Sequence, residues 1–190
     1  DLFRQAAGHF ARGTDTVFLH GTNPVDGAAL PEFADTAIIP NAIQNVYTVG
    51  ESFDRVLHEA SLEIENPNGL GLSKAGYVEL ATLYTDSGVR KYPNATKKAA
   101  FEFLDMTTVT DRVFGEPAWN GSTSDVLAVE GDYSQVRVGI GNITIEKATQ
   151  GNIGSVNLFT TNRVAFLIEV EIGGVNFDTN AFVATKKATV

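Results

Sequence analysis

Cysteine is absent from the 190 residues of this sequence. Its absence excludes disulfides, thiolate catalysis and Cys-ligated metal sites, although it does not identify a cellular compartment. Charged side chains are also scarce, at 19% of the chain, against roughly 25% in a typical soluble domain. No apolar run reaches about 20 residues, so the sequence predicts no membrane-spanning helix.

Positive charge is in deficit, and the formal net charge is −9. An acidic surface repels nucleic acids and anionic membranes, so we expect neither sequence-specific nucleic-acid binding nor a membrane partner. Hydrophobic residues make up 43% of the chain, which is ordinary for a protein that buries a core. The chain begins at Asp1 without a methionine, from which we expect that residues upstream are absent.

The first half of the sequence carries helical spacing. Apolar residues at intervals of three and four predict an amphipathic helix over residues 2–18. Ala37–Ile39 is compatible with a short strand or a helical turn that ends at Pro40. Ser52 is a candidate N-cap for a second helix that continues to Glu65.

A short buried strand is expected at Leu70–Leu72, followed by a third helix over Lys74–Tyr84 with Ser73 as its N-cap. Tyr77, Leu80, Ala81 and Tyr84 would share one face of that helix.

The last half of the sequence is rich in strand patterns, which we expect in the following segments: 107–110, 126–129, 136–145, 166–172 and 181–184. The alternation changes phase at Gly141-Asn142, which predicts a β-bulge. Gly173-Gly174 predicts a hairpin turn before Val175 and Phe177. Because helices come early and strands come late, the pattern favours an α+β fold over a doubly wound α/β sheet.

Few residues suggest catalysis. Asp54, His58 and Glu59 could form a base with a carboxylate that orients it, but their spacing also fits an exposed pair on a helix, which is the interpretation we favour. The three histidines, His9, His20 and His58, have no metal-binding spacing.

Two further segments contain residue types that are used in catalysis or ligand binding. Gly69–Lys74 lacks the residue order of a phosphate-binding loop, so an N-capped helix after a turn explains it better. Glu130 and Asp132 could act as a carboxylate pair or bind Ca²⁺, but solvated charges at a turn between strands are favoured. The sequence therefore predicts no catalytic, cofactor-binding or metal-binding residue.

A family resemblance lies in the last third of the chain. The segments 126–135 and 136–145 resemble the C-terminal signature of Hong Kong 97-type major capsid proteins, in which an apolar strand leads into Gly-Asp-aromatic-Ser and then a long strand. Residues 157–174 and 178–183 are similar to the strands that follow. The match is weaker upstream, where residues 76–93 resemble a helix-then-glycine pattern and residues 2–21 resemble the helix that leads into the axial domain.

The resemblance implies an α+β capsid fold with mixed and antiparallel sheets and a few helices, in which an axial domain stands beside part of a peripheral domain. On this basis residues 1–24 and 130–174 are expected in the peripheral domain, and residues 25–129 and 175–190 in the axial domain. The family's N-terminal arm and extended loop would precede the region present here.

The function implied by the resemblance is structural and not enzymatic. We expect a subunit of an icosahedral phage or prophage capsid that self-assembles into pentamers and hexamers around double-stranded DNA, within virions assembled in the bacterial cytoplasm. Copies of the chain are the expected partners, with scaffold, portal and maturation protease as further candidates, and no cofactor is expected. Two alternatives stay open: an encapsulin-like nanocompartment shell, and an α+β hydrolase or carbohydrate-binding module.

Overall fold

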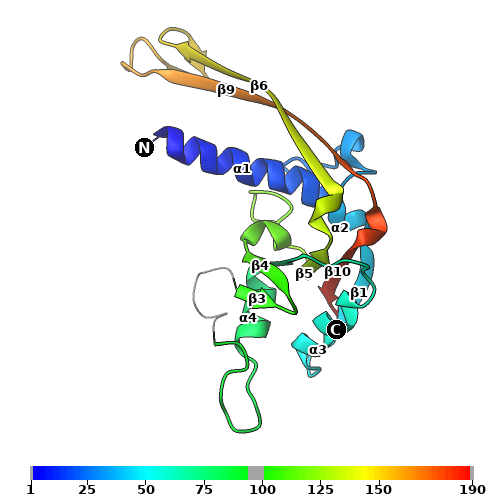
Figure 1. The fold of residues 1–190 in the computed structure, drawn as a ribbon. Helices are drawn as coiled ribbons and strands as arrows, with labels where there is room; N and C mark the ends of the chain where they lie inside the picture. Colours follow the sequence, from blue (N-terminus) through cyan, green and yellow to red (C-terminus); the bar gives the residue numbers. More distant parts are fainter. Residues whose placement is uncertain (1, 94–100, 189–190) are drawn as a thin grey trace. The chain divides into compact units, whose positions relative to one another are not determined.

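The computed structural model describes residues 2–93 and 101–188, and they form two compact units (Figure 1). The first unit comprises residues 1–136 and 176–190, and the second comprises residues 137–175. Helices and strands both contribute, as expected for an α+β fold. The two units are described separately.

A six-stranded mixed sheet forms the centre of the first unit, in the order β1-β10-β5-β2-β4-β3. Its strands, listed in that order, are Ile43–Tyr47, Phe182–Lys187, Val126–Gly131, Gly69–Leu72, Met106–Thr110 and Phe101–Phe103. Strand β5 pairs antiparallel with both β10 and β2, whereas β1 runs parallel to β10 and β4 runs parallel to β2. All six residues of β5 are buried, so this strand is the centre of the sheet.

Helices cover both faces of the sheet. On one face, α3 (Phe53–Ser61) and α4 (Lys74–Ala81) pack through a cluster that includes Phe53, Leu57 and Leu80. On the other face lie α2 (Ile38–Asn41), the last turn of α1 (Leu2–His20) and a short 3-10 helix, Arg112–Gly115. The apolar core therefore has two halves, which the sheet separates.

Three strand glycines make room for aromatic rings on the second face. A Cβ atom at Gly71 would lie 2.1 Å from the ring of Phe114, and one at Gly69 would lie 2.5 Å from the ring of Tyr133. Gly131 is in the same position against Phe182. Since these rings occupy the space of the missing side chains, the glycines are a packing requirement of the sheet.

On the edge strand β1, the backbone N–H of Val46 is already hydrogen-bonded within the chain. The side chain of Asn45 accepts a hydrogen bond from the backbone N–H of the next residue, Val46, at 2.9 Å. Just beyond the strand, Glu51 accepts one from the N–H of Thr48 at 3.2 Å. These donors are therefore not available to a strand from outside.

The second unit is a long β-hairpin. Its strands β6 (Val136–Ala148) and β9 (Ala165–Asn176) form a two-stranded sheet and lie side by side in Figure 1. At the far end, β7 (Asn152–Ile153) and β8 (Val156–Asn157) form a second, very short pair around Gly154, whose φ is +57°.

Several sequence-based expectations are confirmed. The first helix forms as α1, the Leu70–Leu72 strand forms as part of β2, and Ser73 caps α4 by accepting a hydrogen bond from the N–H of Gly76. The expected strands near residues 107–110, 126–129 and 181–184 form as β4, β5 and β10.

Three helix ends differ from the prediction. Helix α3 ends at Ser61 and not at Glu65, because the next residues tighten into bonds of the 3-10 type, although Ile64 stays buried. Helix α4 ends at Ala81, and Tyr84 leaves its face to form an isolated bridge with Arg90. Pro40 lies inside α2, within its first turn, where a missing N–H leaves no bond unmade.

The N-cap at Ser52 is only half confirmed. Ser52 has the N-cap position of α3, but its hydroxyl donates to the carboxylate of Asp54 and makes no cap to the backbone.

The hairpin turn predicted at Gly173-Gly174 is wrong. Strand β9 runs through both glycines to Asn176, because β6 is long enough to pair with it there, and the Gly173 carbonyl lies 3.7 Å from a Cβ placed on Gly139. The reversal occurs instead between Ala148 and Ala165. The bulge at Gly141-Asn142 stays a prediction, since β6 continues through that point as one strand.

Substituting Gly76 by alanine is expected to destabilise the first unit by about 1–3 kcal/mol, the usual range for overpacking a core. A Cβ at this position would lie 2.0 Å from the carbonyl oxygen of Leu127, so α4 would have to move away from β5. Gly8→Ala in α1 is the matched control, because a Cβ there meets nothing within 4 Å, and it should stabilise by roughly 0.5–1 kcal/mol. Urea unfolding of both variants measures the difference; equal effects would contradict the assigned packing.

Candidate assembly surface

The three residues considered for catalysis do not form a site. Asp54 is held by Lys91 at 2.8 Å, by Tyr92 at 3.0 Å and by Ser52. Burial would raise the pKa of Asp54, but the bonds from Lys91, Ser52 and Tyr92 outweigh it and hold this pKa below its ordinary value. His58 and Glu59 lie exposed, and Glu59 pairs with Arg55 at 3.5 Å. The predicted exposed helix face is thus confirmed for His58 and Glu59, while Asp54 anchors the 91–92 segment.

Glu130 and Asp132 likewise do not act as a pair, and the expectation of solvated charges is wrong for both. Glu130 is fully buried in β5, and Asp132 is 8% exposed. Asp132 accepts four hydrogen bonds from its neighbours, whereas neither oxygen of Glu130 has a partner within the described residues. No group of three or more His, Asp or Glu side chains in residues 2–93 and 101–188 could hold a metal ion.

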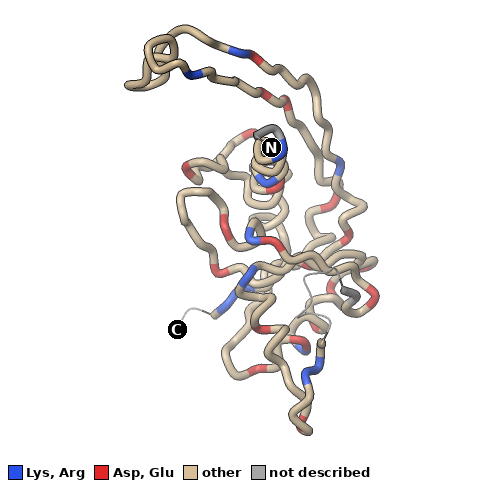
Figure 2. The backbone as a smooth tube through the Cα atoms, turned by 90° about the vertical axis from the view of Figure 1, so that its left-hand side faces the viewer, with Lys and Arg blue, Asp and Glu red and all other residues tan. Residues whose placement is uncertain are grey.

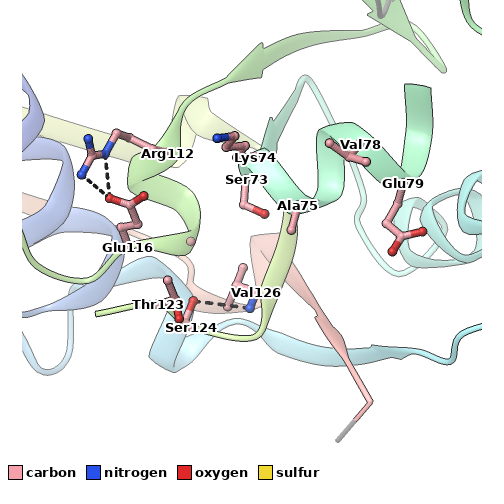
Figure 3. A pocket seen from close by; sticks show the side chains of 11 residues that line it. Ser73, Lys74, Ala75, Val78, Glu79, Arg112, Glu116, Thr123, Ser124 and Val126 are labelled. Carbon is pink, nitrogen blue, oxygen red and sulfur yellow. Dashed lines mark hydrogen bonds and ion pairs between the residues drawn. The ribbon is translucent and has the colours of Figure 1, made fainter. Parts of the chain in front are cut away.

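A shallow hollow of about 450 Å³ lies beside the start of α4 (Figure 3). At its edge Arg112 and Glu116 form an ion pair with a 2.6 Å hydrogen bond, and the hydroxyl of Ser73 is occupied as the N-cap of α4. The hydroxyls of Ser73 and Ser124 accept from backbone N–H groups and are not bonded to a basic side chain, so among the described residues the hollow joins no nucleophile to a base. Gly69–Lys74 is thus a strand followed by a capped helix, as expected.

The β6–β9 hairpin carries the chain's most unusual surface. Leu158 is the one buried residue between residues 137 and 175. Ten large apolar residues are exposed there: Val138, Ile140, Ile143, Ile145, Ile153, Phe159, Val164, Phe166, Leu167 and Val175. The exposed fractions of Ile140 and Phe159 reach 65% and 75%. We call these ten residues the hairpin patch, and large exposed apolar surfaces are typical of interaction sites.

Charge distinguishes the hairpin from the rest of the chain. Residues 137–175 contain three basic side chains, Arg137, Lys147 and Arg163, and three acidic ones, Glu146, Glu169 and Glu171, so their net charge is zero. The full chain has a net charge of −9, which therefore resides outside the hairpin. Figure 2 shows the hairpin strands mostly uncharged, with a few blue and red positions. A neutral apolar surface can approach a copy of itself without strong repulsion.

The chain is fixed by a polar network where it leaves β5 for the hairpin. Asp132 accepts from the side-chain amide of Asn68 at 2.6 Å, from the N–H and hydroxyl of Ser134 at 3.0 and 2.6 Å, and from Gln135 at 3.1 Å. Gln135 in turn accepts at its backbone carbonyl from the N–H of Phe177, the residue that follows β9, at 3.0 Å. Hydrogen bonds from Ser134 and Gln135 hold the pKa of Asp132 below its ordinary value.

The sequence pattern does not reveal the hairpin patch or the Asp132 network. The alternation in β6 and β9 predicts strands, but it does not tell whether the second face of a sheet is covered. The signal that could have found the patch is the long apolar alternation of both strands, together with the lack of a helical pattern between residues 136 and 184 that could cover it.

Comparisons with known proteins gave matches among solved structures. A structure from Gordonia phage Cozz matches 98% of this chain with a TM-score of 0.82 and 25% identity, and one from Mycobacterium phage Ogopogo matches 93% with a TM-score of 0.74 and 25% identity. The capsid of an empty GTA particle matches 99% of the chain with a TM-score of 0.60 and 12% identity. The chain spans 62%, 63% and 65% of these three proteins, respectively.

No family model and no curated protein matches the sequence. None of the helices in the described chain is both long and apolar enough to cross a bilayer.

Replacing Asp132 by asparagine should lower the stability of the first unit, because an amide cannot accept at both ends from the Asn68, Ser134 and Gln135 donors. Since the folded pKa of Asp132 is lowered, its stabilisation is present at neutral pH and is lost as the pH falls through that pKa. Denaturant unfolding at pH 7 and pH 3 should therefore show a smaller acid-induced loss in Asp132→Asn than in the unchanged protein.

The matched control is Asp178→Asn, because the carboxylate of Asp178 accepts a single hydrogen bond from the described residues, from the N–H of Asn180 at 2.9 Å. Its effect should be smaller at both pH values, and an effect equal to that of Asp132→Asn would contradict a special role for the network.

Proposed function

This chain has the fold of the Hong Kong 97-type capsid proteins, and we propose that it is a structural subunit of a phage or prophage shell, not an enzyme. The observation that carries the proposal is the match over 98% of the chain to a structure from Gordonia phage Cozz, at a TM-score of 0.82 and 25% identity. The name of the GTA structure, which describes a capsid, supports the same role.

The physical character of the hairpin patch supports self-assembly. A two-stranded sheet is at best marginally stable in water by itself. Residues 137–175 bury only Leu158, so most of the apolar area of this hairpin stays in contact with water in a single chain. Contact with neighbouring copies would remove that area from water, and each Å² of apolar surface buried contributes about 25 cal/mol.

The proposed assembly is a closed shell. Heterologous contacts, in which different surfaces of identical chains meet, close into rings when the rotation between neighbours allows it. We infer pentamers and hexamers of this subunit, which enclose double-stranded DNA without reading its sequence. The net charge of −9 is compatible with a wall that surrounds DNA and does not grip it.

The division into domains follows from the same proposal. Residues 1–24 and 130–174 would belong to a peripheral domain, and residues 25–129 and 175–190 to an axial domain. Scaffold, portal and maturation protease are proposed as further partners, and the assembled virion is the proposed location, reached from the bacterial cytoplasm.

Expression of the chain within its full-length product, followed by electron microscopy, tests the proposal. Closed polyhedral particles that contain no other protein are the expected result. A stable monomer that turns over a small substrate would overturn it.

The double substitution Ile140→Thr, Ile143→Thr should abolish closed particles while it leaves the subunit folded. Threonine keeps the β-branched shape that suits a strand, and exposed substitutions usually change stability by less than about 0.5 kcal/mol. The two isoleucines are 65% and 62% exposed, so the fold of one chain does not depend on them. Sedimentation measures assembly, and circular dichroism measures folding.

A matched control is Val25→Thr, Leu62→Thr, which removes similar apolar area from the first unit, where these residues are 61% and 72% exposed. Particles should persist in this control. Loss of particles in both variants, or in neither, would contradict a specific role for the hairpin patch.

A further inference from the structure

Glu130 is buried at the centre of the sheet without a partner. Its residue is 0% exposed, and neither carboxylate oxygen makes a hydrogen bond to any described residue. An ionised carboxylate in such a place costs several kcal/mol, which ordinarily forces the group to take up a proton. Burial accordingly raises the pKa of Glu130 to about 8.

The immediate surroundings are apolar. Glu130 is paired in register with Leu70 of β2 on one side and with Val183 of β10 on the other, so all three side chains share one face of the sheet. On that face Val183 packs with Ala60 and Ile64, which belong to the end of α3 and the turn that follows it. The end of α3 therefore lies over the region where the carboxyl group is buried.

None of the titratable groups on the elements packed against β5 forms a hydrogen bond with the carboxyl group of Glu130. These groups are Asp54, Arg55, His58 and Glu59 of α3, Glu63 and Glu65 of the turn that follows it, Lys74, Tyr77 and Glu79 of α4, Arg112 of the 3-10 helix Arg112–Gly115, Lys186 and Lys187 of β10, and Tyr133 after β5. Three of the basic side chains already form ion pairs with other acids: Arg55 with Glu59, Arg112 with Glu116, and Lys187 with Glu79.

The charge of Glu130 affects the titration of Tyr133, which lies three residues further along the chain. Burial first, and then the negative charge of Glu130, raises the pKa of Tyr133. Its hydroxyl donates to the carbonyl of Val129 at 3.2 Å and not to Glu130. Within the described residues, therefore, no hydrogen-bond donor contacts the carboxylate that would form when Glu130 loses its proton.

The turn over Glu130 is held by weak bonds. Leu62, Glu63 and Ile64 donate to carbonyls three residues earlier, at 3.2, 3.1 and 3.3 Å. Leu62 is 72% exposed, and only Ile64 of the three is buried. The turn can therefore leave the sheet at the loss of few apolar contacts, whereas β5 has neighbours on both sides.

We propose that Glu130 is a proton-operated latch: the protonated acid keeps the end of α3 closed over the sheet, and loss of the proton lifts residues 61–66 from the sheet, so that Ile64 and Glu130 become exposed to water. This conformational device goes beyond the proposed structural role, and it does not depend on assembly. A subunit so built is held most firmly in acid solution and loosens progressively as the pH rises toward 8.

The direction of the pH dependence follows from linkage. The folded pKa of about 8 lies above the ordinary value of 4.5, so the folded state keeps a proton that an open or unfolded state releases. The stabilisation is complete below pH 4.5 and is lost as the pH rises toward 8. Within that window the equilibrium constant for opening rises by up to about tenfold per pH unit.

Hydrogen exchange of the purified chain tests the latch. Between pH 6 and pH 9, the protection factors of the Glu63 and Ile64 amides should fall by on the order of 10- to 100-fold in the unchanged protein. They should stay constant in Glu130→Gln, which replaces the neutral acid by a neutral amide of the same shape. Glu63→Gln is the matched control on the exposed side of the turn and should behave as the unchanged protein does.

A second measurement needs no variant. In protein labelled with ¹³C at the glutamate carboxyl carbons, one resonance should keep the shift of a protonated acid at pH 7 and titrate near pH 8. Titration of every glutamate below pH 6 would overturn the proposal, as would equal exchange in the unchanged protein and Glu130→Gln. Because both readouts are made on a single chain, they are independent of whether shells form.

Discussion

Strand β5 is the element on which the first unit depends. It pairs with β10 on one side and β2 on the other, and each of its six residues is buried. Both halves of the core contact it: Leu127 and Ala128 lie in the cluster under α3 and α4, and Val126 and Val129 lie in the cluster under α1 and α2. The end of the chain is thereby joined to its middle, since β10 follows the hairpin in sequence and pairs with β5.

The hairpin has the opposite character. The first unit buries its apolar side chains in two clusters, and its strand glycines leave room for aromatic rings. In contrast, Leu158 is the one buried residue of residues 137–175. The Asp132 network holds the start of the hairpin by hydrogen bonds, which are directional and leave the apolar strands available. Stability and interaction are thus assigned to different parts of one chain.

Local signals predicted most elements of the fold because they act over a few residues. The apolar stripe of α1, the Ser73 cap and the short apolar run of β5 depend on neighbours in sequence, and each formed where it was expected. Gly173-Gly174 failed as a turn because pairing with a distant strand overrode a local preference. The burial of Glu130 could not be read from its sequence position, because Val183, which lies beside it, is far away in the chain.

The edge strand β1 has a consequence for a protein made in many copies. Newly synthesised chains that crowd together can join strand to strand and grow into fibrils, which compete with ordered particles. Asn45 binds the N–H of Val46 from its own chain, so an arriving strand would first have to displace that amide. The molecule can therefore be abundant and rich in exposed apolar side chains, while one edge of its main sheet resists uncontrolled polymerisation.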